Sequence, residues 1–143
     1  MLSNTSKYAI RAVIYLALYS SREKRCGIKE ISEKLKLPTP FLGKILQILA
    51  KNGILESVKG PGGGFCLLKS PLDISVLAIV DIMDGPGTFT NCLIRTEPCS
   101  KNAPCSLHDK VSPYRDSLRK VLQTESIADI VSEFRHDSDR IRI

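Results

Sequence analysis

Residues 6–20 are apolar at almost every position, a pattern typical of a helix that is buried on several sides. The run contains Arg11, has no small-residue cleavage site after it, and is too short and too interrupted to cross a bilayer. We therefore expect a core helix of a cytoplasmic protein, with no signal peptide and no membrane partner.

A short amphipathic helix is predicted next, over residues 27–35. Three aliphatic side chains share one helical face, and Lys29 points elsewhere. The dipeptide Leu37-Pro38 ends this segment, because the residue before a proline avoids the helical conformation.

The following helix is predicted to begin at Thr39 and Pro40. Thr39 can cap the free N–H groups, Pro40 suits the first helical position, and Gly53 is a plausible stop. Apolar residues recur at i, i+3, i+4 and i+7, which makes one stripe. The stripe consists of Leu42, Ile45, Leu46 and Leu49, and the opposite side shows Gly43, Lys44, Gln47 and Lys51.

Two short strands are predicted over residues 54–59 and 65–69, with the turn sequence GPGGG between them. Ser75 can then cap a helix over residues 76–84. A hairpin that follows two helices joined by a tight turn is the pattern of a winged helix-turn-helix. The predicted fold is therefore mainly α with a small β-hairpin, and residues 1–86 form a winged helix-turn-helix domain.

The charge balance favours a polyanionic partner, most simply nucleic acid. The chain has 21 Lys and Arg against 15 Asp and Glu, a net charge of +6 and a pI near 9.2. Polar side chains of the second helix of the motif would reach base edges in the major groove, and the glycine-rich tip lets backbone N–H groups approach phosphate. Phe41 either touches a thymine methyl group or packs. A solvated helix face beside a flexible loop is the alternative. The predicted DNA-binding residues are Lys29, Thr39, Pro40, Phe41, Lys44, Gln47, Lys59, Gly62 and Gly63.

The remaining chain divides into three predicted parts. Residues 87–106 lack periodicity and form a loop, residues 107–135 form helices, and residues 136–143 are a polar tail. Pro113 either starts the first of these helices or bends it. A heptad-like seam of apolar residues runs along this helix. The seam consists of Leu107, Val111, Tyr114, Leu118 and Val121.

Three cysteines and a histidine lie close together in and just after the predicted loop. Their spacing is C-x6-C-x5-C-x2-H, formed by Cys92, Cys99, Cys105 and His108. Thiolate and imidazole are ligands of zinc and of iron–sulfur clusters, and a proline before each of the last two cysteines stiffens the loop. The pattern predicts a metal site.

The kind of metal site stays open on spacing alone. Three thiolates and a nitrogen can hold 2Fe–2S, and three thiolates with an exchangeable fourth ligand can hold 4Fe–4S. The spacing is also close to that of a CCCH zinc finger, and a metal-free thiol sensor is a further alternative.

Other roles for the cysteines are weaker. Five cysteines without a secretory signal argue against a disulfide framework. A nucleophilic-cysteine enzyme would need a pocket and an oxyanion hole that the sequence does not indicate, so we expect no enzyme. Cys26 and Cys66 stand alone and are expected to be small buried hydrophobes.

Together, the winged helix and the cysteine loop resemble the Rrf-type family of bacterial winged-helix transcription regulators, in its iron–sulfur (IscR-like) branch. The resemblance covers nearly the whole chain. It is carried by the opening SKYAIRAVIYLAL, the helix-turn-helix ISEKLKLPTPFLGKILQILAKNGIL, the wing SVKGPGGGFCLLKSPLDIS, the three-cysteine loop with CSLH, and the later ESIADIV.

This resemblance implies a homodimer that reads a palindromic operator with two recognition helices. The helix with the heptad-like seam would cross to the partner. By the same resemblance, the three cysteines and His108 would ligate a cluster, 2Fe–2S in preference to 4Fe–4S, with which the protein senses iron, redox or nitric oxide status. Two positions differ from the family pattern: the interval from Cys92 to Cys99 is one residue longer, and Gly43 stands where an acidic residue is usual.

Overall fold

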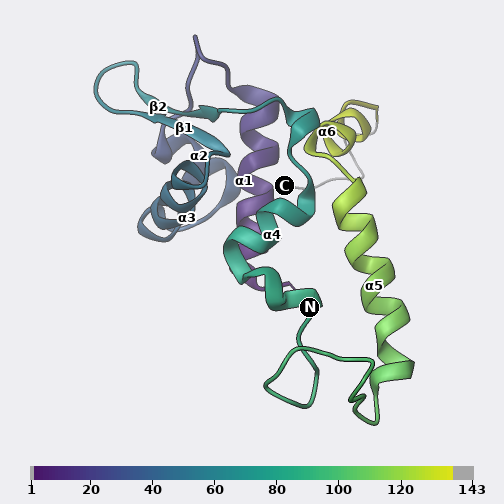
Figure 1. Ribbon diagram of the computed structural model, residues 1–143. Helices are drawn as coiled ribbons and strands as arrows, with labels where there is room; N and C mark the ends of the chain where they lie inside the picture. Colours follow the sequence, from purple (N-terminus) through teal and green to yellow (C-terminus); the bar gives the residue numbers. More distant parts are fainter. Residues whose placement is uncertain (1, 137–143) are drawn as a thin grey trace.

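The computed structural model describes residues 2–136, in which helices surround one long central helix and a small hairpin projects from one end (Figure 1). The elements follow the order of a winged helix-turn-helix with two further helices, as the sequence predicted. They are α1 (Asn4–Tyr19), α2 (Ile28–Leu35), α3 (Thr39–Lys51), β1 (Leu55–Val58), β2 (Gly64–Leu67), the 3-10 turn η1 (Pro71–Asp73), α4 (Val76–Asp84), the 3-10 turn η2 (Pro86–Phe89), α5 (His108–Thr124) and α6 (Ile127–His136).

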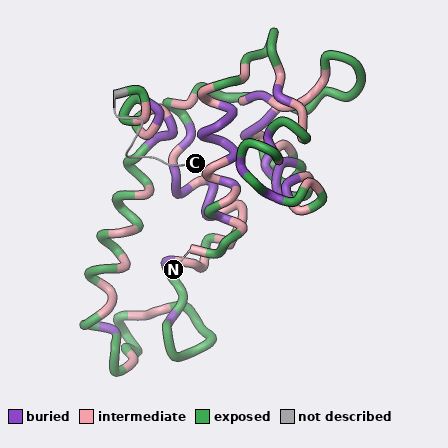
Figure 2. Tube along the Cα trace, turned by 180° about the vertical axis from the view of Figure 1, so that it is seen from behind, coloured by how far each residue is buried: buried purple, intermediate pink, exposed green. Residues whose placement is uncertain are grey.

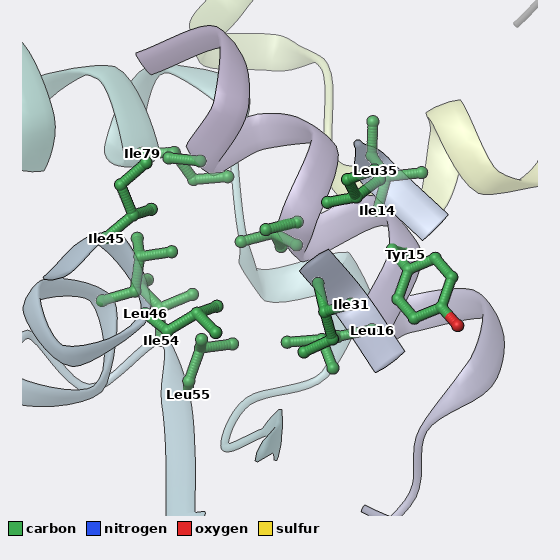
Figure 3. Packing of buried hydrophobic residues seen from close by; sticks show 14 of the residues in the cluster. Ile14, Tyr15, Leu16, Ile31, Leu35, Ile45, Leu46, Ile54, Leu55 and Ile79 are labelled. Atoms are coloured by element: carbon green, nitrogen blue, oxygen red, sulfur yellow. The ribbon is translucent and has the colours of Figure 1, made fainter. Parts of the chain in front are cut away.

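The main core lies around α1, whose apolar side chains meet those of α2, α3, α4 and the hairpin (Figure 3). Leu16, Ile31 and Leu46 are each 0% exposed. Removing one such side chain from water stabilises the fold by about 1.5–3 kcal/mol. The near-continuous apolar sequence of α1 therefore reflects neighbours on several sides, as expected.

The turn between α2 and α3 differs from the sequence prediction at its start. Pro38 occupies the capping position, Thr39 is already helical and makes no capping hydrogen bond, and Pro40 follows it. The predicted roles of Thr39 as cap and Pro40 as first helical residue are therefore wrong. The physical reason is a tertiary contact: the hydroxyls of Thr39 and Ser32 lie 3.0 Å apart, and Ser32 donates to the Leu37 carbonyl at 2.5 Å.

Gly43 also lies elsewhere than predicted, since it faces α2 and not the exposed side of α3. A Cβ added at this position would lie 3.1 Å from Cδ1 of Ile28. The absence of a side chain therefore allows α2 and α3 to pack closely. The predicted end of the helix is confirmed, because Asn52 caps α3 and Gly53 follows with a φ of +74°.

The hairpin is antiparallel and pairs Leu55 with Leu67 and Val58 with Gly64. The chain around Cys26 adds a short third edge, with hydrogen bonds of 3.0 and 2.9 Å exchanged with Phe65. Gly64 is required here, because a Cβ on it would lie 2.6 Å from the Cys26 carbonyl oxygen. The two strands were predicted, and the third edge was not.

Helix α4 begins and ends with side-chain hydrogen bonds to backbone N–H groups. The hydroxyl of Ser75 accepts from Ala78 at 3.1 Å, which confirms the predicted cap. At the other end, Asp84 accepts from the backbone N–H of Ser3 at 3.0 Å. This contact ties the end of α4 to the start of α1.

Helix α5 stands beside the domain, and its first turn lies next to the cysteine loop (Figure 1). It begins at His108 and contains Pro113 in its interior, so the alternative that the helix starts at Pro113 is wrong. Proline is tolerated within the second turn because only one backbone hydrogen bond is lost, on a solvent-exposed side of the helix.

Helix α6 returns to the main core, where Ile127 and Val131 are buried. Backbone hydrogen bonds hold its start to the segment before α4: Ile127 donates to the Ile74 carbonyl at 2.8 Å, and Val76 donates to Glu125 at 3.0 Å. His136 ends α6, and the rest of the predicted polar tail lies outside the described residues. No helix among residues 2–136 has both the length and the apolar character needed to span a membrane.

Candidate functional site

The predicted DNA-binding residues lie on α2, α3 and the hairpin. Lys44 and Gln47 are exposed one turn apart on α3, with Pro40 exposed at its start, and Lys29 is exposed on α2. Phe41 is half-buried and packs edge-on against Tyr8, with ring centroids 5.7 Å apart. Two roles were considered for Phe41, and the structure shows the packing contact. Ile48, which sequence reasoning missed, is 40% exposed beside this face.

The wing has a tight tip that depends on glycine. The backbone N–H of Gly63 donates to the Gly60 carbonyl at 2.9 Å, and a Cβ on Gly63 would lie 2.3 Å from the Val58 oxygen. Gly62 has a φ of +74° but open space around it. Lys59 is exposed at the base of the tip. The wing therefore presents bare backbone next to one cation, a surface suited to a phosphate backbone.

The cysteine loop folds back on itself before it reaches α5. Asn91 and Pro98 form an isolated β-bridge, and Cys99 donates its backbone N–H to the Thr90 carbonyl at 2.8 Å. His108 donates its own N–H to the Cys105 carbonyl at 3.0 Å, which closes the turn into α5. These bonds bring the four predicted ligands to the same end of the molecule.

The four predicted ligands lie in two pairs. Sγ of Cys99 and Nδ1 of His108 are 2.9 Å apart, and His108 is buried, with 7% of its surface exposed. The second pair is Cys92 and Cys105, whose thiols lie close enough for Cys105 to affect the pKa of Cys92. Backbone N–H groups of Arg95 and Ile94, together with Cys105, lower the pKa of Cys92 to about 6.

The chemistry of these donors fits zinc or an iron–sulfur cluster, but the two pairs do not share one centre. Within residues 2–136, no three Cys, His, Asp or Glu side chains are grouped to hold a metal ion. The space lined by Cys99, Cys105, His108 and Arg115 has a volume of about 10 Å³. That is room for roughly one water molecule. Three thiols and an imidazole are nevertheless the ligand types that such a group requires.

Arg115 is a residue of this site that sequence reasoning missed. It lines the same small space as Cys99 and His108, and the neighbouring Cys99 and Asp116 side chains raise the pKa of Arg115 above its ordinary value. Helical spacing could have identified Arg115 from the sequence, because a residue seven positions after His108 lies on the same face of α5.

The other two cysteines are structural, as expected. Cys26 and Cys66 are each 1% exposed, and none of the five cysteines, all of which are described, forms a disulfide. Burial raises the pKa of Cys26 to about 11 and also raises that of Cys66. Cys66 donates to Glu56 at 3.6 Å, and Glu56 in turn pairs with Arg25 at 2.6 Å.

The predicted seam on α5 divides between two sides of the helix. Val111 and Leu118 are half-buried, and Leu118 packs against a second small cluster of Leu77, Val80 and Phe89. The other three seam residues are exposed at intervals of seven: Leu107 by 37%, Tyr114 by 78% and Val121 by 52%. A single apolar stripe on α5 is thus left open to solvent.

Comparison with known proteins identifies the family. The model of the Rrf2 family, described as iron-dependent transcriptional regulators, matches residues 2–133. The chain belongs to the Rrf2 family. Its members are transcriptional regulators and not enzymes, so the expectations of a winged-helix regulator, of DNA binding and of no enzyme hold for this Rrf2 protein.

Individual relatives and solved structures agree with this membership. The Rrf2 protein is 34% identical to a protein of Aquifex aeolicus named as an HTH-type transcriptional regulator, over 91% of this chain and 90% of the relative. It is 30% identical to IscR of Pectobacterium carotovorum, over 92% and 79%.

Two solved structures share its fold. CymR, the global cysteine regulator of B. subtilis, has a TM-score of 0.77 at 22% identity, with 93% of this chain and 97% of CymR covered. IscR of T. potens has a TM-score of 0.72 at 24% identity, with 100% and 93% covered.

Proposed function

We propose that this Rrf2 protein is a homodimeric regulator whose DNA affinity is set by an iron–sulfur cluster, 2Fe–2S in preference to 4Fe–4S. Cys92, Cys99, Cys105 and His108 would hold the cluster. The observation that carries the proposal is the 2.9 Å contact between the Cys99 sulfur and Nδ1 of His108 at the start of α5. It supports the histidine as a fourth ligand beside three thiolates.

Successive segments of the chain have separate roles in this proposal. Residues 1–86 read DNA, residues 87–106 together with His108 hold the cluster, and α5 makes the dimer. Tyr114 and Val121 leave apolar surface uncovered on α5, and a second copy of this helix would bury it. A two-fold axis between the helices would present two copies of α3 to successive major grooves, so the operator would be palindromic.

On the DNA side, Lys44, Gln47 and Lys59 have separate roles. Gln47 is exposed on α3 and its amide can donate to and accept from base edges, whereas the two lysines neutralise phosphates. Phosphate contacts set affinity and register, and base contacts set sequence preference.

The signal would reach the DNA-binding domain through the small cluster around Phe89. Phe89 lies three residues before Cys92 and packs on Leu77 and Val80 of α4, where Leu118 of α5 also packs. Asp84 at the end of α4 is hydrogen-bonded to Ser3 at the start of α1. A change in loop position therefore moves residues that touch α4, α5 and α1 at once. The two loop positions must differ in cluster affinity for this to act as a switch.

When bound, an iron–sulfur cluster supplies a one-electron centre that is sensitive to iron supply and to oxidants. The chain's own part is to offer three thiolates and a neutral imidazole, to bury His108, and to keep the loop attached to Phe89.

A second candidate is a cluster-free thiol sensor, and the lowered pKa of Cys92, to which Cys105 contributes, favours it. Here peroxide would take two electrons and two protons from these thiols, giving a disulfide and two molecules of water. A related alternative is a zinc ion held permanently by the same donors, which would stabilise the loop and would not act as a sensor.

One preparation distinguishes the candidates. The protein is purified without oxygen and assayed for visible absorption, iron, sulfide and zinc, and its DNA affinity is measured before and after oxidation. A coloured protein with stoichiometric iron and sulfide, whose affinity changes on cluster loss, supports the proposal. A colourless protein with stoichiometric zinc contradicts it, and a metal-free protein that changes affinity on oxidation supports the thiol sensor.

His108→Ala tests the fourth ligand, with Asp109→Ala as its neighbour control on the exposed side of α5. We expect the first variant to shift the visible spectrum and shorten the lifetime of the cluster, and the second to match wild type. Unchanged spectrum and lifetime in His108→Ala would remove His108 from the ligand set.

Lys44→Ala and Lys59→Ala test the DNA face, with the exposed Lys120→Ala of α5 as control. Each of the first two should weaken binding and reduce the slope of log affinity against log salt by about 1. A salt slope equal to that of Lys120→Ala would exclude a phosphate contact for the lysine concerned.

A further inference from the structure

The turn between α2 and α3 holds a lysine in an unfavourable backbone conformation. Lys36, the residue that caps the end of α2, has a φ of +54° and a ψ of +47°, and its side chain is exposed. Among residues 2–136, every other residue with a positive φ is a glycine. In this left-handed conformation Cβ crowds the following carbonyl oxygen, so glycine would fit the position better than lysine.

The backbone of the turn is fixed by Ser32 of α2. Its carbonyl accepts from the backbone N–H of Lys36 and, at 3.0 Å, from that of Leu37. Its hydroxyl donates to the Leu37 carbonyl at 2.5 Å and lies 3.0 Å from the hydroxyl of Thr39. These bonds hold the Cα of Lys36 in one place, while its ammonium group forms no ion pair within the part of the chain that the structure describes.

A purely structural role for the lysine is weakly supported. A cation at the end of a helix can stabilise the last carbonyl groups. At the end of α2, however, the half-buried Arg11 of α1 already provides one, since its Nη2 donates to the Leu35 carbonyl at 3.2 Å. The helix end therefore has a cation in direct contact, and the exposed Lys36 is left for another partner.

The place of the turn indicates what that partner is. In a helix-turn-helix, the first helix crosses the DNA backbone and the start of the second enters the major groove. Lys36 lies between the two, three residues before Thr39, where α3 begins. A lysine carries a compact positive charge on a flexible stem, which suits contact with a phosphate.

We infer that Lys36 binds a DNA phosphate at the edge of the major groove that α3 enters, and that the rigid turn holds it there. A phosphate contact of this kind fixes the position of α3 along the duplex without reading a base. The inference rests on the DNA-binding part of the proposed function, which it extends to a residue outside the predicted set, and it involves no metal.

The backbone conformation gives this inference a distinctive consequence. Replacing Lys36 by glycine relieves the crowding in the turn and removes the cation in a single change. Stability and DNA affinity should therefore move in opposite directions, as expected where local strain is kept for function. A residue that served the fold alone would lower stability when replaced.

The test compares the full-length wild type with Lys36→Gln, Lys36→Gly, Lys36→Arg and Lys51→Gln, all purified in parallel. Lys51 is the matched control, because it is also exposed but ends α3 at the opposite end from the turn. The probe is a fluorescein-labelled duplex that the wild type has selected from a random-sequence library. Anisotropy titrations over a range of salt concentrations give the affinity and its salt slope, and thermal unfolding without DNA gives the midpoint.

We expect Lys36→Gln to lower the slope of log affinity against log salt by about 0.9 per bound chain, the value for one lost phosphate contact. If the two proteins bind equally at about 1 M salt, this slope corresponds to about an eightfold loss of affinity at about 0.1 M. Lys36→Arg keeps the charge and should match wild type. Lys36→Gly should lose the same affinity while its unfolding midpoint rises by about 2–4 °C.

A wild-type salt slope in Lys36→Gln, or equal reductions in Lys36→Gln and Lys51→Gln, would overturn the inference while DNA binding stands. If Lys36→Gly unfolds at a lower temperature than wild type, Lys36→Gln decides: an unchanged slope overturns the inference, and a reduced one supports it. A wild type that selects no duplex rejects the DNA-binding part of the proposed function, and the inference with it.

Discussion

The DNA-binding half and the cysteine-bearing half of this Rrf2 protein use apolar residues in opposite ways. Around α1 the leucines are buried, and Leu46 is 0% exposed, whereas Leu93 in the loop is 67% exposed. Figure 2 shows the same contrast, with buried residues concentrated in the domain and mostly exposed residues along the loop and α5. The first half forms most of the main core, to which α6 adds Ile127 and Val131, whereas the loop and α5 present surface that a partner or a cofactor can cover.

This difference separates stability from responsiveness. Segments with few buried contacts open at low free-energy cost, and regulatory elements are drawn from them. The loop is held mainly by backbone bonds at residues 90–99 and by the contact of Cys99 with His108. It can therefore rearrange without unfolding the domain that reads DNA.

The largest effect should come from a core truncation in the DNA-binding half. Leu46→Ala should lower the free energy of unfolding by about 2–5 kcal/mol, because it leaves a cavity among fully buried neighbours. The matched change Leu93→Ala should cost less than about 0.5 kcal/mol. Urea unfolding of the metal-free protein measures both, and similar losses in the two variants would contradict the contrast drawn between the halves.

The next effect concerns association through the exposed stripe of α5. Tyr114→Ala should weaken the proposed dimer by about 2 kcal/mol or more, because the ring is 78% exposed in one chain and would anchor the interface of two. Analytical ultracentrifugation over a range of concentrations gives the dissociation constant. Tyr19→Ala, which removes a 51% exposed tyrosine of α1, is the control. A dimer as tight as that of the control would argue against α5 as the interface.

A smaller effect should arise at the tip of the wing. In Gly63→Ala the new methyl group would lie 2.3 Å from the Val58 carbonyl oxygen, so the tip must change shape. DNA affinity should fall about tenfold, or about 1.4 kcal/mol. Gly53→Asn, at a position outside the predicted DNA-binding set, should bind almost normally, since there is open space there and asparagine tolerates a positive φ. Fluorescence anisotropy with operator DNA compares them, and equal affinities would show that the tip makes no close approach.

The smallest effect is a pH dependence at the start of α6. Hydrogen bonds from the hydroxyl and the backbone N–H of Ser126 lower the pKa of Asp129. A lowered pKa in the folded state means that this stabilisation is complete above the ordinary pKa, about 4, and is lost as pH falls through the lower folded-state value. In Ser126→Ala, the free energy of unfolding should therefore fall less steeply as the pH is lowered on the acid side.

The control for that slope is Ser132→Ala, which removes a hydroxyl that donates to the Asp129 carbonyl and not to its carboxylate. Thermal unfolding between about pH 2 and about pH 5 measures the slopes. Identical slopes in Ser126→Ala and wild type would show that the Ser126 hydroxyl does not hold the carboxylate.

Local patterns in the sequence predicted most helices and strands, because their signals are local. The apolar run of α1, the Ser75 cap and the glycine after α3 each act within a few residues of themselves. Thr39 and Gly43 were misplaced because their partners, Ser32 and Ile28, belong to another helix. A helical pattern shows which side of a helix is apolar. It does not show which residue of another helix will contact a given side chain.

The same limit applies to the candidate site. The residues and spacing of Cys92, Cys99, Cys105 and His108 are visible in the sequence and predict metal chemistry, since ligand type and interval are properties of the chain. Only the tertiary structure decided that the Cys99 sulfur meets His108, that Arg115 lines the same small space, and that the seam of α5 is half covered by its own domain. Those facts depend on how the loop folds back and on how α5 packs, which no local sequence pattern specifies.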